Sequence, residues 1–129
     1  MDENIFIYFE TMDMCARFKK DNMKMYICEK IKFEHFGSQS HDIFYDHEAK
    51  LSRNWHYNWS KFYFFKKHYN YFYALKKILP NLLRAIKSYF RNIFSSSEEN
   101  RNKKILASYE LKGIFAAIML KKSEFRIKF

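Results

Sequence analysis

The sequence predicts an α/β beginning (a β-α-β remnant) followed by an all-helical C-terminal tail of about three amphipathic helices. Three observations predict this class. An almost continuous apolar run at 4–9 is typical of a buried strand. Apolar and polar residues partly alternate at 24–33, as in a second strand. From about Ile43, large apolar residues recur every three or four positions, which is the spacing of one helix face.

A first helix is expected between the two strands. Glu10 or Thr11 can begin it, and Asp13 falls in its first turn, near the positive end of the helix dipole. Open α/β sheets place their chemistry where strands end, so Glu10 and His35, which follow the two strands, could face one crevice. On spacing alone, an acidic first turn explains Glu10 and Asp13 more simply than catalysis does.

The rest of the chain predicts helices. Pro80 is expected to end the first of them, and a second follows at 82–93. The polar stretch at 95–103 predicts a linker, and a third helix is expected at 104–120. The expected organisation is therefore 1–42, 43–94, 95–103 and 104–129. The aromatic residues from Trp55 to Tyr73 fit a core between helices better than a surface that stacks on sugar rings or bases.

Composition narrows the possible partners. The chain has 129 residues, 48% of them hydrophobic, with two glycines, one proline and a formal net charge of +10. Between 48 and 94, ten Lys and Arg residues stand against one acid, Glu48, which suits an anionic partner. Two cysteines make neither a disulfide framework nor a zinc site, and no apolar run is long enough for a membrane span. A cytoplasmic location, peripheral on the inner face of a membrane, is the expectation.

Two stretches resemble family-2 glycosyltransferases with the glycosyltransferase A-type fold. Those enzymes typically show F-x-Y-F-E-[DE]-x-D-L-C-x-R, then a strand and an H-x-G-x-x-S loop; residues 6–42 are similar, with FIYFETMDMCAR at their start. Residues 52–84 are similar to the helical tail of a bacterial subgroup with R-N-W-H-x-x-W-S-x-F-Y-x-x-K-K-H, and here have RNWHYNWSKFYFFKKH. The resemblance implies transfer of sugar from a nucleotide-diphosphate donor to a glycan or lipid-linked acceptor, in envelope polysaccharide or glycolipid synthesis.

The resemblance also assigns roles to residues. Glu10 matches the first acid of the family's carboxylate pair, which supplies the base for the acceptor hydroxyl, and Asp13 matches the second acid. His35 matches a histidine near the diphosphate and its divalent metal, Mn²⁺ or Mg²⁺. The remaining matches would contact substrate or diphosphate, and they are Ser38, Ser40, Arg53 and Trp55.

The sequence departs from the family in two respects. Thr11 stands where the family has a second adjacent acid. The nucleotide-binding strands and the D-x-D metal motif are not among these 129 residues. We therefore expect a C-terminal fragment of an enzyme, which by itself is inactive and binds no metal tightly.

The alternative is a non-enzymatic module. A basic chain rich in aromatic residues could bind an anionic membrane surface or nucleic acid. Nucleic acid is the less favoured partner, because no recognition-helix, RNA-binding or zinc-finger signature is present.

Overall fold

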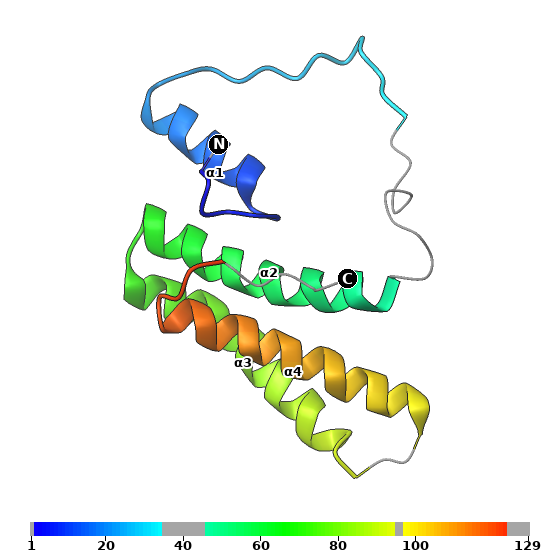
Figure 1. Cartoon of the computed structure of the whole chain (residues 1–129). Helices are drawn as coiled ribbons and strands as arrows, with labels where there is room; N and C mark the ends of the chain where they lie inside the picture. Colours follow the sequence, from blue (N-terminus) through cyan, green and yellow to red (C-terminus); the bar gives the residue numbers. More distant parts are fainter. Residues whose placement is uncertain (1, 35–45, 95–96, 124–129) are drawn as a thin grey trace.

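A computed structural model describes residues 2–34, 46–94 and 97–123, and across these ranges all regular secondary structure is helical. The elements are α1 (Glu10–Lys20), α2 (Asp46–His68), α3 (Tyr71–Arg91) and α4 (Glu98–Ile118). Helices α2, α3 and α4 pack against one another as a bundle, and α1 lies over the end of α2 that leads into α3 (Figure 1).

The core of the molecule lies between α2, α3 and α4. Large side chains come from α2, and small or aliphatic ones come from the two helices that pack against it. The buried cluster consists of Trp55, Trp59, Phe62, Ala74, Ile78, Ile114 and Ala117. The three- and four-residue spacing of these positions explains why the segments are helical, since that spacing gives each helix one continuous apolar face.

Gly113 sets how closely α4 approaches α2. A Cβ atom added at this position would lie 2.3 Å from the backbone oxygen of Trp55. Only glycine therefore allows the two helix backbones to pass this closely.

The strand expected at 4–9 is wrong. Ile5 N–H donates to the carbonyl of Asp2 in a turn, at 3.1 Å, and Tyr8 and Phe9 both have left-handed backbone conformations, with φ of 67° and 66°. Two successive residues in this region end an extended conformation. The apolar side chains pack on α2 instead: the ring of Phe9 lies 5.6 Å from that of Phe64.

The strand expected at 24–33 is also wrong as a description of this chain. The helix between the two segments is present as α1, but Met23–Glu34 has no strand partner within the described ranges. Alternation predicts a strand only where a neighbouring strand can accept its backbone hydrogen bonds. The predicted β-α-β remnant is therefore replaced by α1 and an exposed segment without regular secondary structure.

The helix boundaries differ from the expected ones as well. The chain turns at Asn70, whose side chain caps α3 by accepting from the N–H of Tyr73 at 2.8 Å. Helix α3 then continues through Pro80 without ending. Buried contacts hold it on both sides of the proline, because Ile78 lies in the core and the Asn81 side chain donates to Asn58 at 2.7 Å. Helix α4 begins at Glu98, inside the segment expected to be a linker.

Candidate functional site

The main polar cluster of the described structure is built around Asp13, on the buried face of α1. Its side chain is 1% exposed and accepts three hydrogen bonds. Arg17 Nε donates to Oδ2 at 3.0 Å, one turn further along α1. Lys67 Nζ and His68 Nε2 donate to Oδ1 at 2.6 Å and 2.8 Å. The cluster therefore joins the start of α1 to the last turn of α2.

A second carboxylate, Asp2, extends the cluster. Its Oδ2 accepts from Lys67 Nζ at 2.8 Å and from the Tyr63 hydroxyl at 3.0 Å. Its Oδ1 accepts from the backbone N–H of Asn4 at 2.9 Å. Lys67 thus bridges two carboxylates. Residues 2–13, which we call the N-terminal segment, are therefore attached to α2 at both of their ends.

The backbone between these carboxylates is held on α2 too. The hydroxyl of Ser60 donates to the carbonyl of Ile7 at 2.9 Å, and the ring of Tyr57 contacts those of Tyr8 and Phe9. These contacts support the left-handed conformations of Tyr8 and Phe9, which are costly for residues with a Cβ atom. The strained pair fixes the position of the next residue, Glu10.

The electrostatics of the cluster favour its charged form. Burial by itself raises the pKa of Asp13, but the hydrogen bonds from Lys67, His68 and Arg17 outweigh it, so the pKa lies below its ordinary value. Asp2 follows the same pattern: burial raises its pKa, and the hydrogen bonds, with that from Lys67 foremost, bring it well below the usual range. Burial lowers the pKa of Lys67, yet its bonds to both carboxylates raise it overall.

These shifts predict a pH dependence with two limits. Carboxyl groups whose folded pKa is depressed contribute stability above the unfolded value, about 3.9, and lose it as the pH falls through the folded pKa. The raised pKa of Lys67 contributes stability below about 10.4, which is lost as the pH rises through the folded pKa. We expect urea unfolding at a series of pH values to show stability declining below about pH 4 and above about pH 10.

Asp13→Asn tests whether the carboxyl group of Asp13 causes the loss of stability at low pH. The variant should be less stable at neutral pH, and its stability should decline less between pH 5 and pH 3 than that of the wild type. Asp21→Asn, which changes an exposed carboxylate just after α1, is the matched control and should keep the wild-type slope. If the free energy of unfolding of Asp13→Asn fell with pH as steeply as that of the wild type, Asp13 would not be the cause of the loss at low pH.

Glu10 differs from Asp13 because one of its carboxylate oxygens has no hydrogen-bond partner in the described structure. Its Oε2 atom is buried and has no hydrogen-bond partner in the part of the chain that the structure describes. A buried acceptor left without a partner is unfavourable and uncommon. Of the two acids that the sequence singles out, Asp13 accepts hydrogen bonds from three donors, and Glu10 has one oxygen without a hydrogen-bond partner in the described structure.

The other candidate residues are not brought together. Trp55 is 6% exposed and belongs to the helix core, where its backbone meets Gly113. Arg53 is half-buried two positions earlier on α2, a spacing that directs the two side chains to different sides of a helix. Three further candidates lie outside the described residues, and they are His35, Ser38 and Ser40. Within the described ranges, no group of three or more His, Cys, Asp or Glu residues could hold a metal ion.

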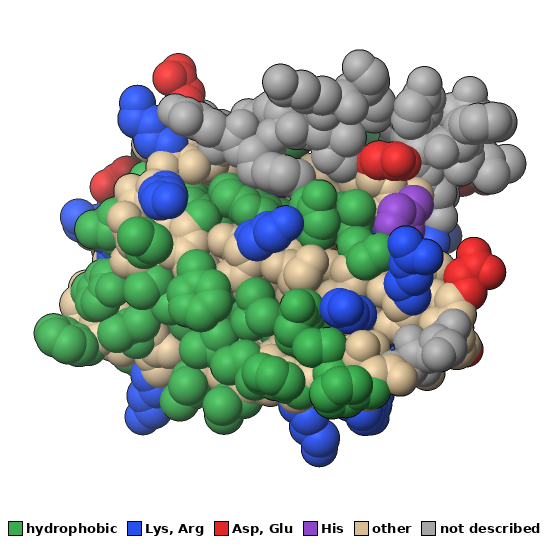
Figure 2. Space-filling model, turned by 60° about the horizontal axis from the view of Figure 1, so that its bottom comes forward, with side chains coloured by type: hydrophobic (Ala, Val, Ile, Leu, Met, Phe, Trp, Pro, Cys, Tyr) green, Lys and Arg blue, Asp and Glu red, His purple; other side chains and the backbone are tan. Residues whose placement is uncertain are grey.

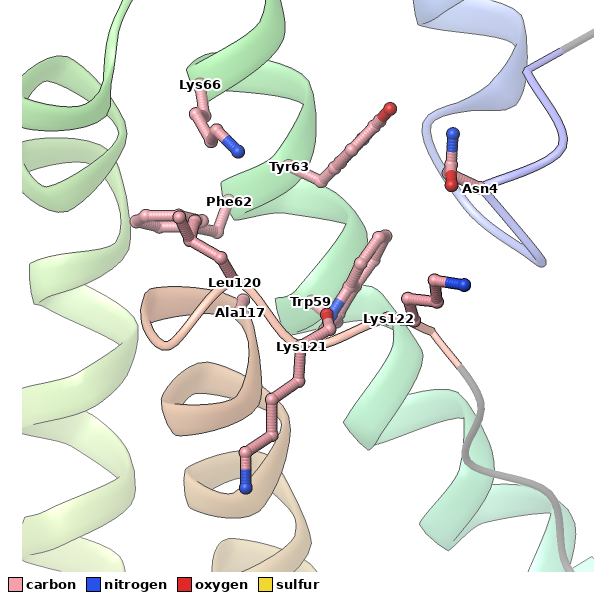
Figure 3. Close-up of a pocket in the computed structure, with 9 residues that line it drawn as sticks. All are labelled: Asn4, Trp59, Phe62, Tyr63, Lys66, Ala117, Leu120, Lys121 and Lys122. Atoms are coloured by element: carbon pink, nitrogen blue, oxygen red, sulfur yellow. The ribbon is translucent and has the colours of Figure 1, made fainter.

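A small cavity lies beside the cluster, between the N-terminal segment, α2 and the end of α4 (Figure 3). The indole of Trp59 crosses it and donates to the carbonyl of Lys121 at 2.9 Å. Its lining consists of Asn4, Trp59, Phe62, Tyr63, Lys66, Ala117, Leu120, Lys121 and Lys122. The volume is about 90 Å³, whereas ligand pockets usually begin at about 300 Å³. A nucleotide sugar does not fit here.

Reasoning from the sequence missed the partners of Asp13. Lys67 and His68 lie more than 50 positions away, and nothing in local spacing connects them to α1. One signal was available in the sequence, because all three residues belong to the stretches that resemble the family. Asp13 lies in the first motif, and Lys67 and His68 end the second.

Comparison with protein-family models gave no match, and comparisons with curated proteins and with solved structures gave none either.

Proposed function

We propose that this chain is the C-terminal portion of a family-2 glycosyltransferase, in which α1 and the helix bundle form one wall of the sugar-transfer site. One observation carries the proposal: the two stretches that resemble the family are the two that contact each other. Asp13, from the first motif, accepts hydrogen bonds from Lys67 and His68, which end the second. Ser60, also in the second motif, donates to Ile7 in the first. Residues of the two similar stretches therefore attach the N-terminal part of the chain to α2.

In this proposal, Glu10 and Asp13 have different roles. The carboxylate of Glu10 takes the proton of the acceptor hydroxyl as that oxygen attacks the anomeric carbon, and the nucleoside diphosphate leaves with the electron pair of the broken bond. Asp13 is a positioning residue, because its contacts with α2 fix the start of α1 and hence Glu10. In this proposal His35 lies near the divalent metal that would neutralise the diphosphate, and the nucleotide-binding part supplies the other ligands.

The exposed segment after α1 supports the same proposal. Its large apolar side chains face solvent. They are Met23, Met25, Tyr26, Ile27, Ile31 and Phe33, with exposed fractions of 55%, 53%, 84%, 94%, 58% and 88%. A group of exposed apolar side chains of this size marks a surface that another polypeptide covers. The proposal assigns that role to the nucleotide-binding part of the enzyme, which supplies the sheet that this chain does not form.

Glu10→Gln is the variant that tests the catalytic assignment. In a protein that joins this chain to its nucleotide-binding part, we expect metal-dependent transfer from a nucleotide sugar to fall by about 100-fold or more, because loss of a general base costs this much. The measurement is release of nucleoside diphosphate across a panel of nucleotide sugars. Glu3→Gln, at an exposed position in the same segment, should keep wild-type activity. Equal activity in Glu10→Gln and Glu3→Gln would contradict the role of Glu10.

A further inference from the structure

Helix α3 has a second apolar face, opposite the one that packs in the core. Its exposed members follow one another at steps of seven, four and seven residues, which places them in one line along the helix. They are Phe72, Leu79, Leu83 and Phe90, with exposed fractions of 80%, 48%, 58% and 64%. We call this line the α3 stripe.

The charges on α3 are of one sign. The helix contains five Lys and Arg residues and no acid: Lys76, Lys77, Arg84, Lys87 and Arg91. Lys76 comes four residues after Phe72, and Lys87 comes four residues after Leu83, so each lies one turn from a member of the α3 stripe. Both are exposed. An apolar line beside exposed cations is therefore available to one partner along the length of the helix.

The surrounding surface is of the same kind. Figure 2, turned so that the α3 and α4 side of Figure 1 comes forward, shows a broad apolar area with Lys and Arg side chains within it and around it. Near the end of α4, Phe115 and Met119 are also exposed, as are Lys121 and Lys122. No helix in the described ranges is long and apolar enough to cross a membrane.

We propose that the α3 stripe binds the surface of an anionic lipid bilayer, with α3 lying in the plane of the headgroups. Charge complementarity selects this partner. Phe and Leu side chains enter the acyl boundary while lysines remain among anionic headgroups, which is how interfacial helices bind. A duplex nucleic acid would satisfy the lysines but leave the apolar side chains in water. A second copy would bring two sets of five cations together. This inference does not depend on the proposed transferase function.

The test is flotation of the whole chain with vesicles of phosphatidylcholine alone or with about one-third phosphatidylglycerol. We expect binding to the anionic vesicles that weakens as salt rises, because surface charge is screened. Phe72→Gln combined with Phe90→Gln should reduce binding at least tenfold, and Lys87→Glu should reduce it at least fivefold, since each Lys or Arg near an anionic surface contributes about that factor.

Matched controls distinguish binding by the α3 stripe from nonspecific hydrophobic or electrostatic binding elsewhere on the chain. Phe33→Gln removes an exposed aromatic ring from the segment after α1, and Lys20→Glu reverses an exposed charge at the end of α1. Both should bind like the wild type, and far-UV circular dichroism should show all variants folded. Any one of three results would overturn the proposal: no binding to anionic vesicles, equal losses in the controls, or a dimer or DNA complex that the α3-stripe variants abolish while vesicle binding persists.

Discussion

Replacing Gly113 with alanine is expected to destabilise the helix bundle by about 2 kcal/mol or more, and to lower its melting temperature by roughly 10 °C. The new Cβ atom would lie 2.3 Å from the backbone oxygen of Trp55, so α4 must move away from α2. Because the obstacle is backbone, no side-chain rotation can relieve it. The gain in helix propensity from glycine to alanine, about 1 kcal/mol, offsets only part of this cost.

Thermal and urea unfolding followed by circular dichroism measure the effect. The matched control is Asn102→Ala, which introduces alanine at an exposed position of the same helix and should leave stability unchanged or slightly increased. If Gly113→Ala proved as stable as the wild type, the close crossing of α2 and α4 would be wrong.

Asp13→Ala is expected to weaken the docking of α1 on the bundle. The change removes the acceptor of three hydrogen bonds and leaves Lys67 and His68 without their shared partner. Breaking a buried ion pair costs about 3–5 kcal/mol, and we expect the lower end because Lys67 and Arg17 can turn toward solvent. The loss should fall on the docking of α1 and not on the bundle.

Hydrogen exchange distinguishes these two parts of the molecule. In Asp13→Ala, amides of α1 should exchange faster than in the wild type, while those at the centres of α2 and α4 keep their protection. Asp21→Ala, at the C-cap of α1, is the control and should behave like the wild type. Unchanged protection of α1 in Asp13→Ala would show that the cluster does not hold it.

The helical part of the fold follows from local patterns in the sequence. Trp55, Trp59 and Phe62 recur at the spacing of one helix face, and the structure buries all three in the core. The boundaries were harder to predict, because they depend on contacts between helices. Asn70 starts α3 by capping it, and the bond between Asn81 and Asn58 helps α3 to continue beyond Pro80. Local propensity favours the opposite outcome at the proline.

The absence of the two predicted strands could not be foreseen from the sequence. Alternation of apolar and polar residues describes a side-chain pattern, but it does not show whether another strand is present to pair with. Met23–Glu34 has the pattern of a strand, yet no described segment of this chain pairs with it. The apolar run at 4–9 packs against α2 and not in a sheet, because the ring of Phe9 contacts that of Phe64. Neither segment forms a sheet, and the apolar side chains of the second one are exposed in the described structure.

The candidate site could be predicted only in part. Glu10 and Asp13 are visible as an acidic start of α1, but their difference is not: burial leaves one oxygen of Glu10 without a partner and surrounds Asp13 with donors. That difference comes from residues on α2 brought close by the fold. The α3 stripe was hidden for a similar reason, because a helix with two apolar faces does not reveal which one is packed.

The coding DNA and transcript upstream of Met1 provide the most direct test of the proposed function. The proposal predicts a reading frame, continuous or frame-shifted, that encodes a nucleotide-binding β-α-β segment and a D-x-D motif ahead of this chain. Unrelated sequence upstream, with a stop codon separating it from Met1, would contradict the assignment to a glycosyltransferase.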